Sequence, residues 1–187
     1  ISAFVDTLIY LVACDKSPSV AMQHIKDCIK ALNYEFSFVP WASGKSPDGA
    51  YGQEHSIKSD YSYHEHENAF VQNSYGRITD HLEKVFMFIE GTDINCDEEC
   101  YKEMINYLVD SQEYTWYKGY SPMMVMGRDV AYQERPSYYR KETVDSLIGV
   151  CDALSKKTNY RKEELILMRD RLLYPEKVER NEATKYF

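Results

Sequence analysis

Long apolar runs and a disulfide framework are both missing from this 187-residue sequence. Its longest apolar runs, such as VFMFI at 85–89, are far too short to cross a bilayer, so we expect no membrane partner. Hydrophobic residues still make up 44% of the chain, which indicates a folded globular protein. Because no internal repeat or low-complexity linker divides it, the sequence predicts a single domain over residues 1–187.

Cysteine is present in an odd number, and the five residues are scattered at positions 14, 28, 96, 100 and 151. A small disulfide-stabilised domain normally has an even count. We therefore predict a reducing, intracellular location, either cytoplasmic or nuclear. Cys96 and Cys100 form one CxxxC pair, which by itself does not supply the four ligands of a structural zinc site.

Several signatures of common enzymes are absent, and basic residues are scarce. No glycine-rich phosphate loop, GxSxG elbow or HExxH helix occurs, which removes the usual nucleotide and protease explanations. The net charge is −8, with −11 in residues 1–134 and +3 in residues 135–187. An acidic chain is a poor non-specific ligand for nucleic acid. Tyrosine is abundant instead, and 17 tyrosines suit a surface that recognises something.

The periodicity of apolar residues predicts both helices and strands. Helical spacing occurs at 18–32, 98–109 and 138–156, and a final helix is expected at 160–173. Bulky or alternating segments predict three buried strands, which are EFSFVP, VFMFI and MMVM. Strands separated by helices favour an α/β fold, so we expect a single domain with a small central sheet flanked by helices.

The polar segment SPDGAYGQEHSIKSD, at 46–60, contains a possible metal site. Asp48, Glu54 and Lys58 have the residue types that hold a divalent cation against a phosphate. In an extended strand over 53–58, Glu54, Ser56 and Lys58 would lie on one face. Ser56 stands where a second acid is expected, and Glu54 lies about 7 Å further along such a strand. The alternative is a solvated loop made of ordinary turn residues.

Several segments, taken in order, resemble the nuclease domain of the XPF/Mus81 (ERCC4-type) family, which has a restriction-endonuclease-like fold. The segments that carry this resemblance are FVDT (4–7), Asp48, EHSIK (54–58), SYGRITDHL (74–82), VFMFIEG (85–91) and ETVDSLIGVCDAL (142–154). The resemblance covers residues 1–156 as a nuclease-like core and leaves 157–187 as a C-terminal helix and tail.

The resemblance implies a Mg²⁺-dependent endonuclease that processes DNA structures, or a catalytically inactive relative of one. In the active form, Asp48 and Glu54 would bind Mg²⁺ and Lys58 would steady the attacking water. Arg77, in the helix that follows, would hold a backbone phosphate of the DNA. Asp60 is a possible substitute ligand for the acid that is missing at Ser56.

Two other functions remain open from the residues. His64 and His66 form an HxH pair, which is a common start to a zinc or iron site, and His81 would be a third ligand. The chain could instead be an acidic inhibitor or immunity-type protein that masks the basic surface of a partner, and a protein partner or homodimer is expected in that case. The acids that would do so are Asp93, Asp97, Glu98, Glu99 and Glu103.

Overall fold

The computed structural model describes the chain in segments, which are residues 17–36, 56–58, 60–65, 69–70, 78–122, 125, 137–139 and 141–178. Helices account for most of these residues. They are α2 (Pro18–Glu35), α3 (Ile78–Ile89), α4 (Glu98–Asp110), α5 (Lys141–Lys157) and α6 (Lys162–Leu173), with short 3₁₀ turns η2 (Gln112–Thr115) and η5 (Pro175–Lys177).

Two small antiparallel sheets accompany the helices. The first contains β1 (Ser56–Ile57), β2 (Tyr63–Glu65) and β3 (Ala69–Phe70), in the order β1-β2-β3. The second pairs β4 (Tyr120–Pro122) with β5 (Ser137–Tyr139). Each strand has only two or three residues, so neither sheet could form the centre of a domain.

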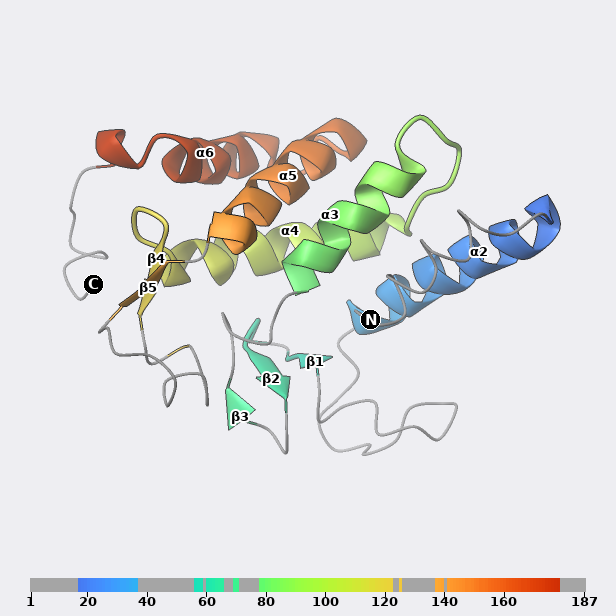
Figure 1. Ribbon diagram of the computed structural model, residues 1–187, viewed down its shortest axis with the longest axis horizontal. Coiled ribbons are helices and arrows are strands. Elements are labelled where there is room, and N and C mark those ends of the chain that lie inside the picture. The colour runs from blue at the N-terminus through green and yellow to red at the C-terminus, as the bar shows by residue number, and fades with distance from the viewer. Residues whose placement is uncertain are drawn as a thin grey trace.

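The helices pack on one another and leave the sheets at the edge. Helix α3 packs against α5, and α6 packs against both α5 and α4. In the view of Figure 1 the sheet β1-β2-β3 lies below α3, whereas β4 and β5 lie beside the left end of α4 and below α6. The hydrophobic core is formed mainly between helices, and the two sheets lie at its edge.

Helix α2 begins and packs as its sequence predicts. Ser17 has an extended backbone at the N-cap, and Pro18 occupies the first turn, where its missing N–H costs nothing. Cys28, Ile29 and Leu32 recur at helical spacing and are all buried. The helix predicted at 18–32 is confirmed, and it continues to Glu35.

The helices predicted at 98–109 and 138–156 are also confirmed in their main part. Acidic residues occupy the first turn of α4, where the helix dipole favours negative charge. The predicted face of α4 is buried through Tyr101, Met104, Ile105 and Leu108. Helix α5 begins only at Lys141, because the preceding residues Ser137–Tyr139 form β5.

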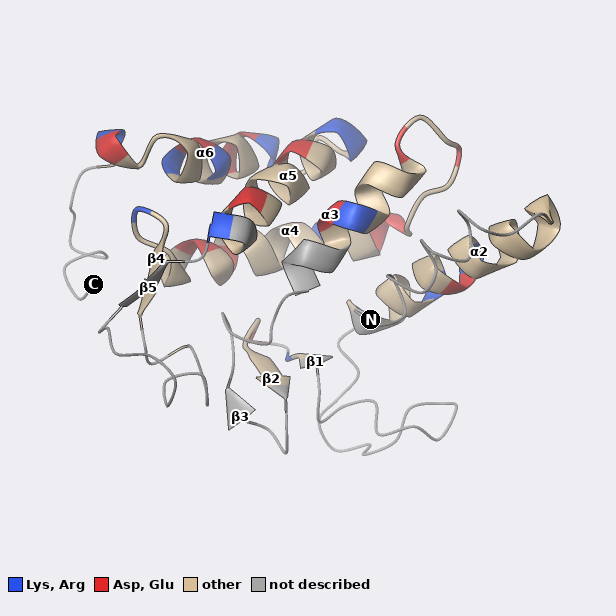
Figure 2. Cartoon of the chain, in the orientation of Figure 1, with Lys and Arg blue, Asp and Glu red and all other residues tan. Residues whose placement is uncertain are grey.

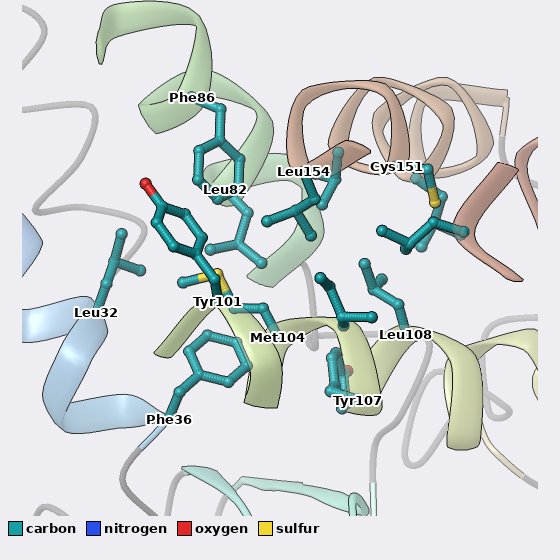
Figure 3. Packing of buried hydrophobic residues seen from close by; sticks show 14 of the residues in the cluster. Leu32, Phe36, Leu82, Phe86, Tyr101, Met104, Tyr107, Leu108, Cys151 and Leu154 are labelled. Carbon is teal, nitrogen blue, oxygen red and sulfur yellow. The ribbon is translucent and has the colours of Figure 1, made fainter. Parts of the chain in front are cut away.

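The core joins side chains from all the helices named above and is closely packed (Figure 3). Aromatic rings from distant segments meet there. The rings of Phe36 and Tyr107 are 6.3 Å apart in an edge-on arrangement, and those of Phe86 and Tyr101 are stacked at 6.2 Å. The four described cysteines are buried free thiols, and burial raises the pKa of Cys28 to about 11.

The segment VFMFI at 85–89 is helical, so the strand predicted there is wrong. These residues form the last turns of α3. Val85, Phe86 and Ile89 are buried, whereas Met87 and Phe88 face outward with exposed fractions of 69% and 37%. A strand buried on both faces would hide all five side chains. The burial follows helical spacing instead. A run of five apolar residues is too short for its periodicity alone to distinguish a strand from a helix.

The other two predicted strands fall only in part on described residues, and those residues are not in strands. Helix α2 runs into EFSFVP, and Phe36 still donates a helical hydrogen bond to the Leu32 carbonyl at 3.1 Å; residues 37–40 lie outside the described residues. In MMVM only Val125 is described, and it is buried in a 3₁₀ turn. The predicted α/β fold with a restriction-endonuclease-like central sheet is therefore wrong, because the domain is mainly helical.

No helix in the described part of the chain combines the length and the apolar character that crossing a membrane requires. The prediction of one domain over residues 1–187, with a tail after residue 156, stays a prediction. Within the described residues, α6 contributes Leu165, Met168 and Leu172 to the same core as the preceding helices.

The core makes a direct prediction about stability. Leu154 in α5 has no exposed surface, so Leu154→Ala should lower the free energy of unfolding by about 2–5 kcal/mol. Leu167 in α6 is 50% exposed, and Leu167→Ala should change it by less than about 0.5 kcal/mol. Urea unfolding followed by circular dichroism measures both. If the two substitutions lowered the free energy of unfolding equally, the packing described for α5 would be contradicted.

Candidate functional site

The sheet β1-β2-β3 carries a histidine on the face turned away from the core. Ile57 lies opposite Tyr63 across the sheet, and both side chains are buried, with exposed fractions of 2% and 9%. Because side chains alternate between the faces of a strand, His64 lies on the other face from Tyr63. The buried face attaches the sheet to the core, and His64 is half-buried on the opposite face.

A chain of hydrogen bonds runs from Asp60 through Ser62 to His64. The Ser62 backbone N–H and hydroxyl donate to the same oxygen of Asp60, at 3.0 and 2.6 Å. The Ser62 hydroxyl oxygen lies 2.8 Å from Nε2 of His64. Since that hydroxyl gives its one proton to Asp60, Nε2 of His64 must be the donor. In a neutral ring the lone pair is then on Nδ1.

The acid at the start of this chain is held in its charged form. The hydroxyl of Ser62 is the main cause that lowers the pKa of Asp60 below its usual value, and backbone N–H groups and His64 add to it. A carboxylate accepts these bonds better than a carboxylic acid does. Asp60 thus keeps the Ser62 hydroxyl oriented, and through it the imidazole of His64.

The turn that leads into β2 is fixed to α4. Lys58 donates its backbone N–H to the Ser62 carbonyl and accepts from the Tyr61 N–H, both at 2.8 Å. Tyr61 is left-handed, with φ 61°, which costs on the order of 1 kcal/mol for a residue with a side chain. Its hydroxyl donates to Glu103 at 3.0 Å, and the Ser111 hydroxyl donates to its carbonyl at 2.9 Å. These two bonds hold the strained turn.

An arginine joins the far end of α4 to the start of α6. Arg161 donates to both carboxylate oxygens of Asp110 at 2.6 and 2.7 Å, to Glu164 at 2.9 and 2.7 Å, and to Asn106 at 3.1 Å. The bonds to Glu164 and then Asp110 raise the pKa of Arg161. Acidic and basic side chains are interspersed along α6 (Figure 2), so this network is part of a mixed-charge surface.

The two polar networks share one stripe of α4. Glu103, Asn106 and Asp110 are three and four residues apart, which places them on a single helix face. Glu103 accepts from Tyr61 of the turn, whereas Asn106 and Asp110 accept from Arg161. The opposite side of α4 is buried in the core. One helix therefore positions the β1–β2 turn and α6 together.

The predicted nuclease residues are only partly described. Lys58 is 9% exposed and sits at the start of the turn just described. Asp48, Glu54 and Arg77 lie outside the described residues, so the metal and phosphate roles given to them stay predictions. The strand expected at 53–58 is present at Ser56–Ile57. Mg²⁺ binding depended on Asp48 and Glu54 and also stays a prediction.

The metal site predicted from the histidines likewise stays a prediction. His64 makes the bond to Ser62 described above, and His66 lies outside the described residues. His81 belongs to the first turn of α3. Among the described residues there is no group of three or more histidine, cysteine, aspartate or glutamate side chains able to hold a metal ion.

Sequence reasoning missed the hydrogen-bonded group of Asp60, Ser62 and His64. The available signal was alternation, because these polar residues occupy every second position while Tyr61 and Tyr63 fall between them. The HxH pair of His64 and His66 instead suggested a metal site. What could not be read from the sequence was the left-handed turn at Tyr61, since that depends on contacts with α4.

The bonds to Asp60 predict a change in its titration. Ser62→Ala removes the hydroxyl that contributes most to lowering the pKa of Asp60, so that pKa should rise toward its usual value. In the wild type the stabilisation by these bonds is present at neutral pH and is lost as the pH falls through the lowered pKa. Carboxyl ¹³C chemical shifts followed over pH measure it. Ser155→Ala in α5 is the control, and an unchanged Asp60 pKa in Ser62→Ala would contradict the bonding.

Comparison with protein families identifies the chain. The model of polysaccharide lyase family 8, N-terminal alpha-helical domain, matches residues 20–168. No curated protein and no solved structure matches the chain. Because the family model covers most of the sequence and describes a helical domain, the chain belongs to polysaccharide lyase family 8.

This membership corrects the functional interpretation of the sequence. The resemblance to the XPF/Mus81 nuclease domain is wrong, and so are the nuclease, DNA-binding and hydrolase functions derived from it. The alternative, an acidic inhibitor or immunity-type protein, also finds no support. The physical reason is that VFMFI, one of the buried strands that the resemblance needed, is part of α3. A protein partner or homodimer and the intracellular location stay predictions.

Proposed function

We propose that this chain is the helical part of a lyase that cleaves an acidic polysaccharide by β-elimination, with proton transfer at strand β2 and its carboxyl end. The observation that carries the proposal is the family match over residues 20–168. The arrangement of Asp60, Ser62 and His64 supports it, because it orients an imidazole at the surface of a sheet that is otherwise anchored in the core.

The reaction sets clear requirements for side chains. A base removes the proton from the carbon next to the sugar carboxylate, and the electron pair forms a double bond to the neighbouring carbon. The bond from that carbon to the glycosidic oxygen breaks, and the leaving oxygen takes a proton from an acid. No water is consumed. The enzyme must therefore supply a base, an acid and groups that stabilise the charge developing on the carboxylate.

Imidazole meets the requirement for the base. In His64 the donation from Nε2 to Ser62 places the lone pair of the neutral ring on Nδ1, where it can accept a proton. The Asp60 carboxylate lies at the other end of the hydrogen-bonded chain and orients the ring through Ser62. A second imidazole, His66, follows two residues later in the sequence, so the proposal is tested at both histidines.

The test uses the full-length protein that carries this chain. Hyaluronan, chondroitin, alginate and polygalacturonate are offered as uronate-containing substrates, and the unsaturated uronate product is followed by its ultraviolet absorbance. We expect product from at least one of them. Substitution of the histidine that acts as the base, in His64→Ala or His66→Ala, should lower kcat by about 10²–10⁴-fold. His24→Ala in α2 is the matched control and should leave kcat unchanged.

Two results would overturn the proposal. The first is cleavage whose products are heavier by one water and lack the double bond, because that is hydrolysis. The second is full activity in both His64→Ala and His66→Ala, which would place proton transfer elsewhere. Mass spectrometry of the products decides the first and steady-state kinetics decides the second.

A further inference from the structure

The segment Tyr117–Tyr120 forms the tightest possible hairpin and presents two tyrosines together. Tyr117 and Tyr120 exchange both backbone hydrogen bonds, each at 2.9 Å. Lys118 and Gly119 between them have φ values of 53° and 81°, which is the pattern of a type I′ turn. Residues paired directly across such a hairpin point to the same face, so the two tyrosine side chains lie next to each other.

A buried network holds this hairpin rigidly. Trp116, which is 8% exposed, donates from Nε1 to the Gln112 side-chain oxygen at 3.1 Å. The Gln112 amide donates in turn to the Tyr107 hydroxyl at 2.6 Å, inside the core. On the other strand Ser121 is completely buried, and Tyr120–Pro122 pairs with Ser137–Tyr139. Trp116 and Ser121 thus face inward, and their neighbours in the hairpin face outward.

The outward face combines aromatic surface with a positive charge. Tyr120 is 49% exposed, and the ammonium group of Lys118 lies 5.6 Å from the centre of the Tyr117 ring. A residue with a side chain is strained at the φ of Lys118, whereas glycine or asparagine would fit more easily. Strained positions of this kind persist where the surrounding structure holds them and often mark functional sites.

These features match the chemistry of one sugar unit of an acidic polysaccharide. The C–H face of a sugar ring is apolar and packs flat on an aromatic ring, while a carboxylate or sulfate group on the ring pairs with an ammonium. The chain is acidic overall, with a net charge of −8, and the Lys118 ammonium beside Tyr117 and the exposed Tyr120 is a cationic position on this acidic protein. A neutral sugar has no anionic group that could pair with the ammonium of Lys118.

We propose that Tyr117, Lys118 and Tyr120 form a subsite that binds one acidic sugar unit of the polysaccharide, an inference that rests on the proposed lyase function. The hairpin and the turn before β2 are attached to the same end of α4. Ser111 binds the Tyr61 carbonyl of that turn, and Gln112, the next residue, binds Trp116 of the hairpin.

The experiment separates binding from chemistry. With the full-length protein and the four uronate polysaccharides named above, dissociation constants come from affinity electrophoresis, and KM and kcat come from product formation. Tyr120→Ala should raise the dissociation constant and KM about fivefold and leave kcat unchanged. Tyr120→Phe keeps the ring and should behave like the wild type.

The charge is tested by Lys118→Asn, which removes the ammonium while keeping a residue that tolerates the left-handed turn. Binding of acidic polysaccharide should weaken about threefold, and the remaining binding should depend less on salt than in the wild type. Neutral dextran is the matched ligand control. Tyr174→Ala is the matched protein control, because Tyr174 is 44% exposed and also has a lysine, Lys177, 4.0 Å from its ring centre.

Each outcome has a distinct meaning. Unchanged binding in both Tyr120→Ala and Lys118→Asn, or an equal loss in Tyr174→Ala, would overturn the subsite, even if the protein forms the unsaturated product. Binding that depends on Tyr120 and Lys118 without any unsaturated product would support the subsite and overturn the lyase proposal. A wild type that neither binds nor cleaves any of the four polysaccharides would overturn both.

Discussion

Burial of α4 is the constraint on which the rest of the structure depends. Seven of its residues are buried, and they include Met104, Ile105, Tyr107 and Leu108 with no exposed surface. Such a helix has only a narrow face left for polar groups. The stripe that contains Glu103, Asn106 and Asp110 forms hydrogen bonds to Tyr61 and Arg161, which belong to other segments of the chain. Packing of α4 therefore decides where both candidate sites can be attached.

The carboxyl end of α4 converts this packing into functional geometry. Tyr61 is kept in its left-handed conformation by Glu103 and Ser111, and that conformation turns the chain into strand β2. Gln112, which follows the end of α4, forms side-chain hydrogen bonds to both Tyr107 of the core and Trp116 of the next hairpin. Both surface features are thus connected to buried groups through one or two hydrogen bonds. Each feature is therefore preformed, and little ordering entropy of the protein would be lost when a ligand binds to it.

The helices were predictable because their information is local. Each signal depends on only a few neighbouring residues: the spacing of apolar residues, a Ser-Pro start, or acids in the first turn. The helices that these signals predicted at 18–32 and 98–109 are confirmed. The failures occurred where local signals were ambiguous. A five-residue apolar run such as VFMFI fits a strand or one side of a helix, and only the exposure of Met87 and Phe88 separates the two. The false α/β architecture and the nuclease interpretation both included that choice among their grounds.

The sequence by itself determined that the protein is globular, that most of its long periodic segments are helical, and that histidine and tyrosine are concentrated in particular polar segments. Tertiary structure alone decided which of those polar residues act together. Ser62 bridges Asp60 and His64 only because the turn at Tyr61 is held on α4, and Lys118 stands over Tyr117 only because the hairpin closes in a type I′ turn. The physical reason is that strained backbone conformations are stabilised by contacts distant in the sequence, and no short window of residues contains both the strain and the contact.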